Sequence, residues 1–180
     1  RNLDDELLLL FKEHSGVVQT VAFRAYVEAE KHKTFSEASS KIYAQKAAEM
    51  GFKILQRDSV RALSNEERNI YYSNYQDVRT AASSEVESLK TKIDPVNVED
   101  YVDHIDYMVN LIGLDHVGIS SDFDGGGGVD GWQDASETLN ITKELVKRGY
   151  SEEEIAQLWG ENLLRVMDEV EAVAAELQNF

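Results

Sequence analysis

Only two stretches of this chain have the composition of buried β-strands, and they lie far apart. Val17–Phe23 (VVQTVAF) and His116–Ser121 (HVGISS) are short and largely apolar, and the first is rich in β-branched residues. Helix-favouring sequence separates them, and strands separated by helices indicate parallel β/α units. Two parallel strands alone leave faces and edges uncovered. The pattern therefore predicts an α/β fold that is the tail of a larger β/α protein, with a free-standing, mainly helical domain as the alternative.

The long segment between the two strands, residues 26–96, is polar and helix-favouring and ends at Asp94-Pro95. It predicts either an inserted helical subdomain or a set of peripheral helices. A clean amphipathic helix begins at Val98 and ends at Gly113, because apolar residues recur there at spacings of three and four. Further helices are predicted for Ser136–Arg148 and Leu163–Leu177.

Charge and composition exclude some classes of partner. The 180 residues carry a formal net charge of −16, so the chain repels phosphate backbones and anionic membranes. No nucleic acid and no membrane contact are therefore expected. Cysteine is absent, which excludes disulfides and thiolate metal sites. The first residue is Arg1 and not Met, which leads us to expect a piece of something longer. The compartment is left open.

A glycine-rich loop with two carboxylates follows the second strand. The run is ISSDFDGGGG, with Asp122 one residue past the strand, Asp124 two residues later, and glycine at 125–128. In β/α folds, functional residues gather at the carboxyl ends of strands. Asp122 is therefore a candidate metal ligand, general base or electrostatic stabiliser, and loop capping by both aspartates is the alternative. The sequence after the glycines fits neither a phosphate loop nor a calcium loop.

The histidines do not form a metal site on their own. The chain has four, and no two stand four residues apart on one helix face. The cluster Asp103-His104-Ile105-Asp106 is interpreted as a solvated helix face, with Asp103 and Asp106 on one side and His104 elsewhere. No metal ligands are predicted within this chain.

Several stretches together resemble the membrane (renal-type) dipeptidases, the M19 metallopeptidase family. Asp115–Gly125 (DHVGISSDFDG) resembles the family signature, and the likeness spans nearly the whole chain. The other stretches that carry it are RNLDDE from Arg1, VDHID from Val102, RGYSEE from Arg148 and GENLLRV from Gly160.

The resemblance implies a metal-dependent-hydrolase (β/α)8 TIM barrel, of which residues 1–180 are the C-terminal portion. Val17–Phe23 would be the seventh strand, His116–Ser121 the eighth, and residues 26–96 a helical insertion between them. Such barrels usually need about 250 residues. The family holds two zinc ions through a His-x-Asp pair, a bridging glutamate and two later histidines, all upstream of Arg1 by this alignment.

The resemblance also implies roles for two residues. Asp122 matches the eighth-strand aspartate that handles the proton of the attacking water and contacts the substrate amine. Arg1 matches the arginine that binds the substrate's terminal carboxylate. Asp124 is assigned no family role; a supporting position behind Asp122, or loop capping, is our hypothesis.

The function expected is zinc-dependent hydrolysis of dipeptides by the complete enzyme, with this chain alone inactive. Two alternatives stay open: a non-catalytic acidic helical module that binds a partner, and another metal-dependent amidohydrolase acting on N-acyl amino acids. Homodimerisation, the preferred dipeptides, and activity on D-residue or β-lactam substrates are left open too.

Overall fold

The computed structural model describes residues 2–178, which divide into two compact units. Within the described residues, the sheet unit comprises residues 2–29 and 96–178, and the helical unit comprises Glu30–Pro95. The sheet unit contains α1 (Asp5–Glu13), β1 (Val18–Val21), α2 (Arg24–Val27), α6 (Val98–Ile112), β2 (Val117–Ser120), α7 (Leu139–Arg148), α8 (Glu152–Ala156) and α9 (Asn162–Gln178). It also has 3-10 turns at η1 (Leu114–His116) and η2 (Ala135–Glu137) and a π turn at η3 (Gln157–Glu161). The helical unit contains α3 (Ala29–Glu49), α4 (Arg57–Arg61) and α5 (Asn65–Lys90).

The two predicted strands form one parallel pair, as expected from the sequence. Val18 of β1 lies opposite Val117 of β2, and Val21 lies opposite Ser120. Each strand has four residues, fewer than the apolar runs suggested. His116 belongs to η1 and not to the strand, and its ring nitrogen Nδ1 bonds the Gly16 carbonyl at 2.8 Å.

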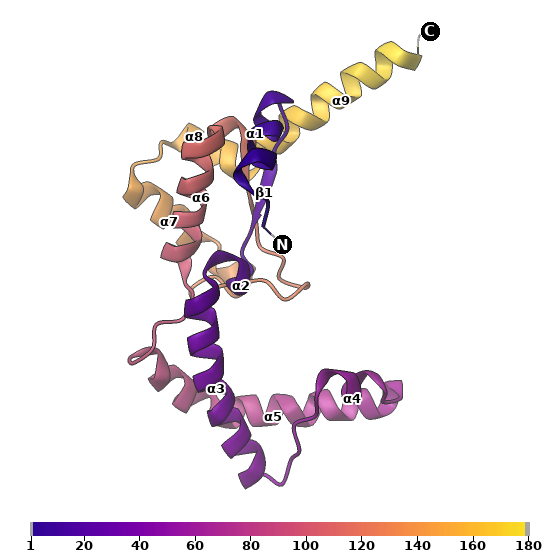
Figure 1. The fold of residues 1–180 in the computed structure, drawn as a ribbon, viewed down its shortest axis with the longest axis vertical. Helices are drawn as coiled ribbons and strands as arrows, with labels where there is room; N and C mark the ends of the chain where they lie inside the picture. The colour runs from indigo at the N-terminus through magenta and orange to yellow at the C-terminus, as the bar shows by residue number, and fades with distance from the viewer. Residues whose placement is uncertain (1, 179–180) are drawn as a thin grey trace. The chain divides into compact units, whose positions relative to one another are not determined.

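One face of this sheet packs against α6, which buries five side chains of its apolar stripe: Tyr101, Val102, Ile105, Met108 and Ile112. Figure 1 shows α6 alongside β1. The Tyr101 hydroxyl donates to the Thr20 carbonyl at 2.6 Å and accepts from the Ser120 amide at 3.3 Å. One buried phenol therefore joins both strands to α6.

The opposite face of the sheet is less covered within the described residues. Gln19, Val21 and Ser120 point there by alternation along the strands, and all three are only partly buried. A side chain at Gly118 would collide with the Gln19 amide, so the two residues lie on the same face. The sheet thus has one face covered by α6 and one face that the described residues cover only in part.

Apolar side chains also stay exposed along α9. Leu164 is 57% exposed, Val170 62% and Leu177 69%. α1 exposes Leu7, Leu9 and Leu10 in the same way. Contiguous apolar surface of this kind is normally covered by other protein surface.

Two helix ends differ from the usual sequence pattern. A glycine often takes the left-handed conformation that ends a helix, but after α1 this conformation belongs to Ser15, with φ of 56°, and not to Gly16. A Cβ at Gly16 would lie 2.9 Å from Cδ1 of Phe11. A glycine also lowers helix propensity, yet at Gly160 a π turn carries the chain continuously into α9.

The helical unit is held together by its own contacts. Lys46 on α3 pairs with Glu85 on α5 at 2.8 Å. Ser64 and Glu67 form the capping box that begins α5. The unit spans Glu30–Pro95, close to the segment 26–96 singled out in the sequence. No helix in residues 2–178 is long and apolar enough to cross a membrane.

Candidate active site

Asp122 lies just beyond the carboxyl end of β2 and has an unusual backbone conformation. Its φ is 55°, in the left-handed region that non-glycine residues seldom adopt. Its carbonyl accepts hydrogen bonds from the amides of Gly125 at 3.0 Å and Gly127 at 2.7 Å. Two bonds from the glycine loop therefore hold the Asp122 backbone in place, which is a common arrangement at functional sites.

The glycines allow the loop to fold tightly around Asp122. A Cβ on Gly125 would overlap the Asp122 carboxylate, and one on Gly127 would overlap the Ser121 carbonyl oxygen. The loop then returns to the sheet, because the Gly128 amide donates to the Ala22 carbonyl at 2.7 Å. The loop is thereby tied to the chain that leaves β1, and both strand ends share one edge.

Replacing Gly127 with alanine should displace this loop. The added methyl group has to push against backbone, so we expect a loss of about 1–3 kcal/mol in the free energy of unfolding. The matched control is Gly160→Ala, since a Cβ at Gly160 meets nothing within 4 Å. Urea unfolding of both variants checks this, and equal stability of the two would contradict the close approach.

A buried tryptophan anchors the loop to the core. Trp132 is 2% exposed and packs its ring 5.4 Å from Phe123 and 5.3 Å from Tyr101, centroid to centroid. Its indole N–H donates to the Thr138 hydroxyl at 3.2 Å. Sequence reasoning missed Trp132, although a tryptophan four residues after a glycine run was a usable signal for an aromatic anchor.

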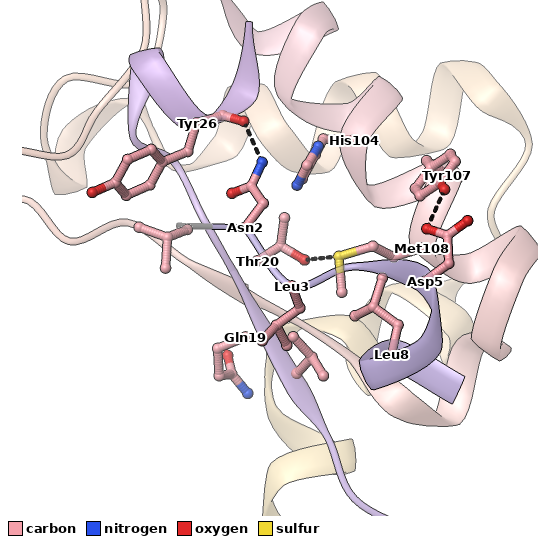
Figure 2. A pocket seen from close by; sticks show the side chains of 12 residues that line it. Asn2, Leu3, Asp5, Leu8, Gln19, Thr20, Tyr26, His104, Tyr107 and Met108 are labelled. Atoms are coloured by element: carbon pink, nitrogen blue, oxygen red, sulfur yellow. Dashed lines mark hydrogen bonds between the residues drawn. The ribbon is translucent and has the colours of Figure 1, made fainter. Parts of the chain in front are cut away.

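The N-terminal segment reaches the same end of β1. Asn2 donates its amide N–H to the Tyr26 carbonyl at 2.8 Å, and Tyr26 lies on α2, directly after β1. Beside this bond is a cavity of about 390 Å³ between the segment from Asn2, β1 and α6. Figure 2 shows Asn2 and Tyr26 at this cavity together with His104 of α6.

His104 lines that cavity and is half-buried, so it does not lie on a solvated face as expected. Asp103 and Asp106 do share the other side of α6, where both bind Arg148 of α7 and the Asp106 contact measures 2.6 Å. These aspartates join two helices.

Burial lowers the pKa of His104 below its ordinary value of 6.5. The unfolded chain then takes up the proton more readily than the folded one. The contribution of neutral His104 to the free energy of unfolding is therefore complete above pH 6.5. It is lost as the pH drops through the lower pKa of the folded state. His104→Gln should remove this part of the pH dependence, whereas the same change at exposed His14 should not. Urea unfolding at about pH 8 and about pH 5 gives the free energy of unfolding of each variant. An equal change between the two pH values in both variants would contradict this role of His104.

The structure describes two of the three predicted site residues. Asp122 is exposed at the carboxyl edge, and its side chain has no hydrogen bond or ion pair with another described residue. Asp124 is likewise exposed and makes no such bond within residues 2–178. The loop amides bond backbone oxygens, so neither carboxylate is seen capping them. Arg1 lies outside the described residues.

No group of three or more histidine, aspartate or glutamate side chains suited to a metal ion occurs among residues 2–178. The described part of the chain therefore does not fit a zinc ion by itself.

Part of the chain is similar in sequence to curated dipeptidases. Dipeptidase aclJ of Aspergillus oryzae is 44% identical over 85 residues, which are 47% of this chain and 20% of that protein. Dipeptidase tcpJ of Claviceps purpurea is 43% identical over 88 residues, 47% of this chain and 21% of that protein. The chain thus matches about a fifth of the length of these curated relatives.

A solved structure resembles the chain over most of its length. The crystal structure of the probable dipeptidase PvdM from Pseudomonas aeruginosa matches with a TM-score of 0.56 and 36% identity, covering 92% of this chain and 40% of that one. The mixed helical fold with its two-strand sheet therefore matches part of a dipeptidase fold. The family model for membrane dipeptidase (peptidase family M19) matches residues 1–180. The chain belongs to the membrane dipeptidase family, peptidase family M19.

Proposed function

We propose that this chain is the C-terminal part of a zinc-dependent dipeptidase and carries its proton-transferring aspartate. The observation that carries the proposal is Asp122, held beyond the carboxyl end of a parallel strand in a chain that matches the family throughout. Carboxyl ends of parallel strands are where β/α enzymes place their chemistry.

The barrel assignment comes from the family resemblance, and the uncovered parts of the sheet unit support it. β1 and β2 are proposed as the seventh and eighth strands of a (β/α)8 barrel, with the helical unit inserted between them. Supporting this, one sheet face is packed on α6 while the other is only partly covered, and apolar residues remain exposed on α1 and α9. Strands contributed by the rest of the polypeptide would pair with the sheet and cover this surface.

Asp122 is proposed as the proton carrier. A carboxylate takes a proton from an attacking water and returns it to the leaving amine, which is general base and then general acid catalysis. Because the side chain is exposed, the carboxylate can reach a substrate. The two hydrogen bonds that glycine amides donate to the Asp122 carbonyl hold the backbone in place. The same carboxylate is proposed to contact the amino group of the dipeptide. Asp124, two residues on, is proposed to support this end of the loop.

Arg1 is proposed to bind the carboxylate of the dipeptide. Support comes from its neighbour, because Asn2 is bonded to Tyr26 directly after β1. A guanidinium binds a carboxylate through two parallel hydrogen bonds. Holding the amino group at Asp122 and the carboxylate at Arg1 would limit the substrate to two residues.

Members of this family are in general zinc-dependent, and we propose that the zinc ligands lie outside this chain. The purified 180-residue chain should then retain less than one zinc ion and hydrolyse no dipeptide. Metal analysis after dialysis, with a dipeptide assay on the same sample, measures both. Two tightly bound zinc ions per chain would sink this assignment.

A substrate panel on an active enzyme that contains this chain tests the reaction itself. Hydrolysis of dipeptides, without hydrolysis of tripeptides or N-acyl amino acids, is the expected result. Preferred cleavage of N-acyl amino acids would instead favour another amidohydrolase of the same architecture. Absence of any hydrolysis, with zinc bound, would favour a non-catalytic module.

A further inference from the structure

The helical unit contains a cavity of its own, far in sequence from the proposed active-site residues. Its volume is about 440 Å³, within the range of about 300–1,000 Å³ typical of small-molecule sites. Three arginines and three tyrosines line it: Arg57, Arg61, Arg68, Tyr71, Tyr72 and Tyr75. All six belong to α4 and α5.

The charge of the helical unit contrasts with that of the rest of the chain. Residues 30–95 carry 11 Lys and Arg against 10 Asp and Glu, a net charge of +1. The remaining residues carry 7 against 24, a net charge of −17. Arginines gathered in one cavity of such an acidic chain therefore mark a place where an anion is attracted.

The three arginines are not neutralised by neighbouring carboxylates. Arg57 forms no ion pair with any described residue, and Arg61 has only Asp58 at 3.7 Å, with both side chains largely exposed. Arg68 donates from Nη2 to the carbonyls of Arg61 and Leu63, both at 3.0 Å. Its Nε is buried and has no hydrogen-bond partner within residues 2–178. The cavity therefore retains positive charge from Arg57 and Arg61, while the Arg68 guanidinium is held in place by the two carbonyls.

The tyrosines provide flat, ordered walls. The rings of Tyr71 and Tyr75 lie nearly parallel, 4° apart with centroids 6.2 Å apart. The Tyr71 hydroxyl accepts from the Leu55 amide at 3.2 Å, which fixes that ring. Tyr72 is 54% exposed beside them, although a ring of this size is usually more buried. Aromatic faces of this kind pack against a flat apolar or aromatic group.

We propose that this cavity binds a small carboxylate attached to an aromatic group, such as an aryl-substituted organic acid. The guanidinium groups would hold the carboxylate, which matches their planar donor pairs, and the tyrosines would pack on the ring. Every residue that lines this cavity belongs to the helical unit, and none of them is a residue of the proposed dipeptide site.

Binding of 3-phenylpropionate to the 180-residue chain tests the proposal. Calorimetry and ligand-observed NMR should give saturable binding with Kd below about 1 mM. The double variant Arg57→Gln, Arg61→Gln should weaken it at least about tenfold, because two charge-assisted hydrogen bonds are lost. Both arginines are exposed, so the fold should persist, which far-UV circular dichroism verifies. The control Lys41→Gln removes one charge from the same unit outside the cavity and should leave Kd unchanged.

Two further probes separate the parts of the ligand. Inorganic phosphate and 3-phenylpropanol should each bind at least about tenfold more weakly, since one lacks the ring and the other the charge. Phosphate binding as tight as that of 3-phenylpropionate would overturn the aromatic part of the proposal. No saturation up to about 10 mM, or equal affinity in the double variant, would overturn the site itself.

Discussion

Asp122→Asn, in an active enzyme that contains this chain, should lower kcat at least about 100-fold. Asparagine keeps the shape of the side chain but takes up no proton, so the proposed transfer from water to the leaving amine fails. The left-handed backbone at Asp122 is also one that asparagine tolerates, so the loop should keep its conformation. The measurement is steady-state turnover of a dipeptide, with zinc content determined on the same preparation.

Two further variants sharpen this result. Asp168→Asn removes one negative charge from the exposed surface of α9, and it should leave kcat within about twofold. Asp124→Asn tests the hypothesis that the second loop carboxylate supports the first, and an intermediate loss is expected. Unchanged turnover in Asp122→Asn, with normal zinc content, would remove Asp122 from the mechanism.

Asn162→Ala should lower the free energy of unfolding by about 2–4 kcal/mol. Asn162 is 3% exposed, and its side-chain amide donates to the carbonyls of Leu114 at 2.7 Å and Val117 at 2.9 Å. Alanine removes both donors, so the Leu114 and Val117 carbonyls each lose one hydrogen bond, and it leaves a small cavity beside them. Because Val117 begins β2, the strand that leads to Asp122 should loosen as well.

Asn140→Ala is the matched control for this change. Asn140 is only partly buried and its amide makes one such bond, to the Gly131 carbonyl at 2.8 Å, so we expect a cost of about 1 kcal/mol. Urea unfolding followed by far-UV circular dichroism compares the two. A cost for Asn162→Ala no larger than that for Asn140→Ala would mean that the two bonds to β2 contribute little.

The elements that the sequence predicted well depend on neighbours a few residues away. The apolar spacing over α6 indicated both its buried stripe and its end at Gly113, where φ is 94°. A serine followed three residues later by a glutamate is the sequence pattern of a capping box, and the structure contains this box at Ser151 and Glu154. Strand identity and parallel pairing followed from the same local patterns and from the helices between the strands.

The interactions that the sequence concealed join residues far apart in the chain. Tyr101 bonds Thr20 across 81 positions, and Asn162 bonds Val117 across 45. A tyrosine at position 101 or an asparagine at position 162 does not by itself indicate which distant residue it will bond. His104 was misjudged for the same reason, because it lines a cavity together with the N-terminal segment and β1, which lie far from it in the sequence.

The sequence by itself determined where helices and strands form, which strand leads into Asp122, and which family the chain resembles. These features follow from periodicity, caps and motifs that act within a few residues. The tertiary structure alone decided that Asp122 is held at φ 55° by two glycine amides and that the glycine loop returns to Ala22. It also decided that three arginines and three tyrosines share one cavity. The bond from Gly128 to Ala22 joins segments far apart in the sequence. The other two features depend on how one loop and two neighbouring helices close in space, which the spacing of residue types does not specify.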